Sequence, residues 1–196
     1  MPCSQLKRLL PALLVLPLAI AVAEEKVLGE QLLFAEPEGW EEVYADREGQ
    51  LSTTEYVPAG QNATNWQEML SIQILLGKPD ADPDAMLSQA ALHLEKSCPD
   101  FELQPIELGG VGDYPTLAVM VMCGQNTQSG HGEFTLLRGI SGKENFYLLQ
   151  KIWRGPAYQA ETGPPVSLDE RKFWLGFLAF LTVCDPALGN CPENLE

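Results

Sequence analysis

Basic residues are scarce in this chain. Its 196 residues include 12 Lys and Arg against 27 Asp and Glu, which gives a net charge of −15 at pH 7. Nucleic acids and anionic lipid surfaces are bound by basic faces, so the charge argues against both as partners. An acidic surface suits solubility, which is the simpler explanation, or a cationic partner.

The motifs of the common catalytic sites are absent as well. The sequence has no Cys-x-x-Cys for thiol redox chemistry, no Gly-x-Ser-x-Gly and no P-loop. The glycines of Gly109-Gly110-Val111-Gly112 have the wrong spacing for a dinucleotide site and indicate a turn. Acidic pairs such as Glu41-Glu42 are too common in so acidic a chain to identify glycosidase carboxylates. We therefore lean against an enzyme and predict no catalytic residue and no cofactor.

Histidine is rare, with two in the chain. His131-Gly132-Glu133 would place two ligands on one face of a strand, but two ligands do not hold a zinc ion. We predict no metal site. His131 and Glu133 remain candidate binding residues, and they carry the alternative hypothesis of an enzyme or metal-binding protein.

One apolar run is long enough to need an explanation, and it lies near the N-terminus. Lys7 and Arg8 precede an apolar stretch over residues 9–21, and Ala21-Val22-Ala23 forms an A-x-A site before Glu24. This is the pattern of a signal peptide over residues 1–23. We expect a periplasmic or secreted protein, cleaved near Ala23-Glu24, with no membrane span afterwards. The mature domain, residues 24–196, would retain 10 basic and 27 acidic residues, a net charge of −17.

Four cysteines follow the predicted cleavage site: Cys98, Cys123, Cys184 and Cys191. An even number in an oxidising compartment indicates two disulfides, for which three connectivities exist. We favour Cys184–Cys191, which closes a short loop, and Cys98–Cys123, which joins a helix end to a strand end.

Two helices are expected. Asp82 is a helix cap with Pro83 at the first helical position, and the helix runs to about Ser97. The second runs over about 168–184, where Ser167 and Glu170 form a capping box. It is apolar on almost every side, which predicts burial on all sides. Its uncharged run, residues 173–183, is too short for the ~20 residues of a membrane span.

Strand patterns and tight turns fill the rest of the mature chain, which favours antiparallel pairing. The run at 115–123 is apolar on both faces and predicts a central strand covered on both sides. The 101–108 run, which contains Pro105, predicts an irregular or edge strand. The fold class is therefore α+β: one domain in which an antiparallel sheet packs against two main helices. The other expected strands are 31–34, 40–45, 51–57, 66–76, 133–139 and 145–154.

Several stretches carry a resemblance to known proteins: 55–61 followed by 65–70, 122–126 and 183–186. They resemble a family of small exported bacterial proteins of unknown function. The order of strands and helices is also similar to the Mog1/PsbP-like fold, an antiparallel sheet between helices. Members of that fold are mostly non-catalytic binding or assembly proteins, so the resemblance implies a protein or small-molecule partner in the cell envelope.

Aromatic residues gather in two regions, with Tyr56 and Trp66 in the first. Such rings either line a groove for a ligand or fill the core. We take Tyr56, Trp66, His131 and Glu133 as the candidate binding residues. The leading hypothesis is an exported, non-catalytic binding or assembly module.

Overall fold

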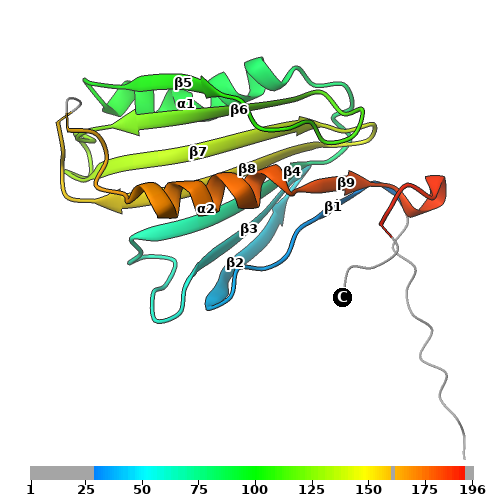
Figure 1. The fold of residues 1–196 in the computed structure, drawn as a ribbon, viewed down its shortest axis with the longest axis horizontal. Helices are drawn as coiled ribbons and strands as arrows, with labels where there is room; N and C mark the ends of the chain where they lie inside the picture. Colours follow the sequence, from blue (N-terminus) through cyan, green and yellow to red (C-terminus); the bar gives the residue numbers. More distant parts are fainter. Residues whose placement is uncertain (1–28, 160–161, 193–196) are drawn as a thin grey trace, which may run out of the picture.

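The structure, a computed structural model, describes residues 29–159 and 162–192. Two helices lie on opposite faces of a seven-stranded antiparallel sheet, so the predicted α+β class is confirmed (Figure 1). The predicted signal peptide, residues 1–23, lies outside the described residues. Within the described ranges, no helix has the length and apolar character needed to cross a membrane.

The strands of the main sheet follow the order β2-β3-β4-β8-β7-β6-β5. Both predicted hairpins, β2–β3 and β7–β8, are confirmed. Pro105 lies on β5, the edge strand of the sheet, which pairs with β6 alone. A proline, which has no backbone N–H to donate, is tolerated on such an edge strand. The strand bounds are β2 Trp40–Glu48, β3 Leu51–Pro58, β4 Glu68–Leu75, β5 Glu102–Ile106, β6 Thr116–Cys123, β7 Gly132–Ser141 and β8 Phe146–Gly155.

The middle of the sheet is β8, flanked by β4 and β7, and β7 is buried along its whole length. The strand expected at the centre, β6, has a partner on each side but lies second from the edge. Hydropathy predicted the wrong central strand because the strands nearest the centre, β7 and β8, each carry a buried cation, which lowers their apolar character. These cations are Arg138 on β7 and Lys151 on β8. Met120 and Met122 of β6 are only partly buried.

Helix α1, Pro83–Ser97, covers β6 and β7 on one face of the sheet. Asp82 caps it by accepting a hydrogen bond from the Asp84 N–H at 3.1 Å, as its sequence predicts. Leu87 and Ala91 are its buried apolar side chains, and they pack against Val119, Val121, Leu137, Phe146 and Leu148.

Helix α2, Leu168–Ala179, covers the opposite face, and the Ser167 hydroxyl caps it. The prediction of a helix buried on all sides to residue 184 is wrong. Trp174 and Leu178 are buried, whereas Phe173 is 60 % exposed and Phe180 is 87 % exposed. A helix lying on one face of a sheet has neighbours on one side only. The chain then leaves the helix because β9, Thr182–Cys184, pairs with β1, Gln31–Leu33.

Two disulfides hold the chain, and both favoured pairings are confirmed. Cys98–Cys123 joins the end of α1 to the end of β6. Cys184–Cys191 closes the loop that contains the short 3₁₀ helix η1, Pro186–Leu188. The Cys98–Cys123 bond fixes the C-terminal end of α1 to β6, close to the candidate site described in the next section.

Candidate functional site

The structure brings together two of the four residues that the sequence nominated. Trp66 and Glu133 line one hollow between α1 and the sheet. Tyr56 is 6 % exposed and belongs to the core on the α2 side, where its hydroxyl donates to Glu36 at 3.4 Å. His131 is exposed in the loop before β7 and does not line this hollow.

This α1-side hollow has a volume of about 380 Å³. Its floor comes from alternate residues of β7 and β8, and one wall comes from α1. Eight of its twelve lining residues carry a hydroxyl, amide, imidazole or charged group, and the other four have apolar side chains. The residues are Trp66, Ala90, His93, Leu94, Asn126, Gln128, Ser129, Glu133, Thr135, Gln150, Ile152 and Arg154.

Arg154 is the residue around which this hollow is arranged. It lies directly opposite Glu133 in the β7–β8 register, and its Nε is 3.8 Å from Glu133 Oε1. Its guanidinium lies over the Trp66 ring, with Cζ 3.8 Å from the ring centroid, as a cation–π pair. The backbone N–H of Arg154 donates to the backbone carbonyl of Gln67 at 2.7 Å. This bond holds the end of β8 against the chain beside Trp66.

Glu133 is held in place by the loop that leads into β7. Asn126, itself buried, donates from Nδ2 to Glu133 Oε1 at 3.3 Å. The same loop is anchored to the end of α1, where the Thr127 N–H and hydroxyl both donate to the Ser97 carbonyl at 2.8 and 2.9 Å. The carboxylate is therefore positioned by an amide and a loop that is tied to α1.

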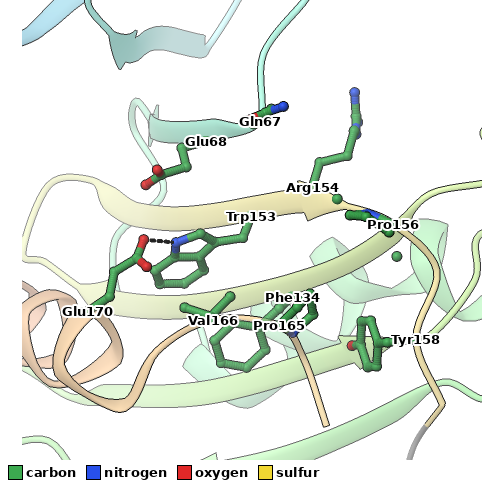
Figure 2. A pocket seen from close by; sticks show the side chains of 12 residues that line it. Gln67, Glu68, Phe134, Trp153, Arg154, Pro156, Tyr158, Pro165, Val166 and Glu170 are labelled. Atoms are coloured by element: carbon green, nitrogen blue, oxygen red, sulfur yellow. Dashed lines mark hydrogen bonds between the residues drawn. The ribbon is translucent and has the colours of Figure 1, made fainter. Parts of the chain in front are cut away.

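A second hollow, of about 270 Å³, lies on the α2 side at the same end of the sheet (Figure 2). The stacked rings of Phe134 and Trp153 form its floor, with centroids 5.2 Å apart. The Trp153 indole N–H donates to the Glu170 carboxylate, drawn as a dashed line in Figure 2. Arg154 is among its lining residues too, but its guanidinium lies over Trp66, which lines only the α1-side hollow.

Tyr158 links β6 to β7 at this end of the sheet. Its hydroxyl accepts from the Cys123 N–H at 3.1 Å and donates to the Glu133 carbonyl at 3.0 Å. Burial raises the pKa of Tyr158 to about 12. Its ring lies so close to Gly132 that a Cβ there would come within 2.7 Å of it. Glycine is therefore required for this ring to pack on β7.

Lys151 contacts two residues that line the α2-side hollow, Glu68 and Trp153. Its side chain is fully buried, and its Nζ lies 4.9, 4.0 and 4.7 Å from the ring centroids of Trp40, Trp153 and Trp174. The ammonium donates to Glu68 at 2.8 Å. Burial lowers the pKa of Lys151 to about 8, while the carboxylate of Glu68 pulls in the opposite direction.

Sequence reasoning missed both of these cations. For Lys151 a signal existed: Tyr147, Leu149 and Trp153 alternate with it on one face of the predicted 145–154 strand, so a lysine stands among buried positions. Arg154 gave no such signal, because its neighbours Trp66 and Glu133 meet it only through the pairing of β4, β8 and β7.

The alternative hypothesis was a metal-binding protein that uses His131 and Glu133. In the part of the chain that the structure describes, no group of three possible metal ligands includes either of them. Among the described residues, one group of three ligand atoms lies close enough to hold an ion: Cys98, Asp100 and Cys123. Its two cysteines form a disulfide and offer no thiolate. Neither His131 nor Glu133 belongs to that group.

No family model matches the chain, and no curated protein matches it.

Proposed function

We propose that this chain is an exported, non-catalytic binding module of the cell envelope, and that it holds a small molecule in the α1-side hollow. The observation that carries the proposal is the pair Arg154 and Trp66, stacked beside Glu133 inside a hollow of about 380 Å³. Ligand sites have volumes of roughly 300–1,000 Å³ and a few convergent polar groups.

The support around the hollow favours binding. Four of its polar residues stand on the central strands β7 and β8, and the loop behind Glu133 is tied to α1 by the Thr127 hydrogen bonds. The nearby Cys98–Cys123 disulfide limits movement of that loop relative to β6. A ligand that enters a pre-arranged site loses less free energy to ordering the protein.

Export to the periplasm is part of the same proposal. The two disulfides fit an oxidising compartment, and the first 23 residues have the pattern of a signal peptide. The resemblance to the Mog1/PsbP-like fold, whose members mostly bind or assemble, points in the same direction.

The experiment is native mass spectrometry of the disulfide-bonded protein after equilibration with small molecules extracted from periplasm. The wild type is expected to retain an adduct that Arg154→Met loses. Arg47→Met makes the same chemical change at an exposed position of β2 and should keep the adduct. Equal adducts, or none, in all three proteins would contradict this proposal.

A protein partner is the second candidate, and the outer side of α2 favours it. Phe173, Phe177 and Phe180 are spaced along one side of the helix end, and with Phe34 they line an apolar hollow of about 390 Å³. Exposed apolar patches mark sites of association. Crosslinking in intact cells tests this candidate: a partner captured by wild type but lost in Phe173→Ser/Phe180→Ser supports it, and an unchanged pattern contradicts it.

A further inference from the structure

The α1-side hollow holds opposite charges side by side, and we infer that its ligand is a free α-amino acid with an apolar or aromatic side chain. The ligand carboxylate would pair with the Arg154 guanidinium, and its ammonium with Glu133. This inference rests on the proposed function, since it names the ligand of that same site.

Both charged groups retain hydrogen-bonding capacity. Arg154 Nε is buried and has no hydrogen-bond partner among the described residues. Its separation of 3.8 Å from Glu133 Oε1 is too long for a hydrogen bond. A guanidinium offers five N–H donors in a planar fork that fits a carboxylate, and an ionised Glu accepts from an ammonium.

The spacing of the two charges fits the ligand. In an α-amino acid two bonds through Cα join the ammonium nitrogen to the carboxylate carbon, so these charges lie roughly 3 Å apart. Arg154 and Glu133 face each other across neighbouring strands at a similar separation, 3.8 Å between their nearest charged atoms. One zwitterion can therefore lie antiparallel to the protein's own pair.

The charge of the site argues against simpler ions. A plain anion would meet the Glu133 carboxylate beside Arg154, and it would approach a chain of net charge −15. A plain cation would be repelled by the Arg154 guanidinium. A zwitterion has no net charge and meets an opposite charge at each end.

The rest of the hollow has room for an apolar side chain. Leu94 of α1 and Ile152 of β8 line it together with the Trp66 ring. These surfaces would accept an aliphatic or aromatic group, while Thr135 and Gln150 add hydrogen-bonding groups between the strands.

The test is calorimetric titration of purified wild-type protein with the free apolar and aromatic amino acids, using leucine and phenylalanine as first probes. The same experiment uses N-acetyl-leucine, which lacks the ammonium, and leucine amide, which lacks the carboxylate. We expect a free amino acid to bind at least about tenfold more tightly than either blocked form. A blocked form that binds as tightly as its free amino acid would overturn the inference.

Variants assign each end of the ligand. Arg154→Met should abolish the preference for free leucine over leucine amide, and Glu133→Gln should abolish the preference over N-acetyl-leucine. Arg154→Lys keeps the charge without the planar fork and should bind with intermediate affinity, which provides a test if Arg154→Met folds poorly. Preferences unchanged in folded variants would overturn the assignment.

The two proposals fail in different ways. If no free amino acid binds but the periplasmic adduct is still lost in Arg154→Met, the hollow binds a ligand and the amino-acid class is wrong. If amino acids do not bind and no adduct depends on Arg154, both proposals are wrong.

Discussion

Arg154 and Glu133 face each other across the β7–β8 pair, with Nε and Oε1 3.8 Å apart on the side of the sheet that α1 covers. Trp66 stacks on the guanidinium, and Asn126 donates to the carboxylate. An ion pair that is held at both ends and opens into a hollow is a poor stabiliser but a good recognition element, because each group keeps free hydrogen-bonding capacity.

Lys151 predicts an unusual dependence of stability on pH. Burial lowers its pKa to about 8 in the folded protein, below its ordinary 10.5. Between these values the unfolded chain binds one more proton than the folded chain, so the free energy of unfolding rises with pH in this window. The penalty of the buried charge is fully present below pH 8.

Replacement of Lys151 by Met tests this dependence. The free energy of unfolding is measured with urea at pH 7.5 and at pH 9.5. The wild-type value minus the Lys151→Met value should be larger at pH 9.5 than at pH 7.5, by at most about 3 kcal/mol. Lys143→Met, at an exposed lysine, should follow wild type. The buried tyrosines are present in all three proteins, so their titration cancels in the comparison. Parallel pH curves for wild type and Lys151→Met would show that Lys151 titrates normally.

The two sides of α2 should respond differently to truncation. Leu178→Ala removes a fully buried side chain and should cost about 2–5 kcal/mol of unfolding free energy. Phe180→Ser alters a side chain that is 87 % exposed and should change it by less than about 0.5 kcal/mol. Chemical unfolding measures both. A large loss in Phe180→Ser would mean that α2 is buried on its outer side as well.

Tyr158 should matter through its hydroxyl group. Tyr158→Phe leaves the ring on Gly132 but removes the partner of the Cys123 N–H and of the Glu133 carbonyl. We expect a loss of about 1–3 kcal/mol in the free energy of unfolding. The matched control is Tyr44→Phe, whose exposed hydroxyl makes a longer bond of 3.4 Å to Asp46. Equal losses in the two variants would contradict this role.

The disulfides should differ in their effects. Cys98–Cys123 closes a loop of 25 positions and Cys184–Cys191 one of 7, so loop entropy gives about 3.5 and about 2.5 kcal/mol respectively. Paired Cys→Ser variants measured by thermal unfolding should show this order. Ligand affinity in the α1-side hollow should fall only when the first bond is removed, since that bond lies beside the Asn126 loop. An equal fall in ligand affinity in both variants would show that the Cys98–Cys123 bond has no specific role in the site.

Local patterns were sufficient for much of the fold. The Asp82 and Ser167 caps, the hairpin turns and the edge position of Pro105 are all decided by neighbouring residues, and the structure confirms them. The burial of α2 was predicted wrongly because hydropathy does not show which side of a helix has a neighbour. Phe173 and Trp174 are adjacent in sequence, yet one is exposed and the other buried.

The site was less predictable than the fold. Trp66 and Glu133 were nominated separately, one as an aromatic residue and the other as a weak metal ligand. Their common partner, Arg154, lies 88 positions from Trp66 and 21 from Glu133, and strand order alone places it between them. Tyr56 was nominated on the same grounds as Trp66, but it faces α2 and is buried.

The most direct measurement uses the four tryptophans as position markers, since each gives one indole N–H signal in a ¹⁵N–¹H spectrum. Small molecules extracted from periplasm are added to labelled protein while these signals are followed. We predict that the Trp66 signal shifts while those of Trp40, Trp153 and Trp174 on the α2 side stay in place. Shifts confined to those three, or no shift of Trp66, would contradict ligand binding in the α1-side hollow.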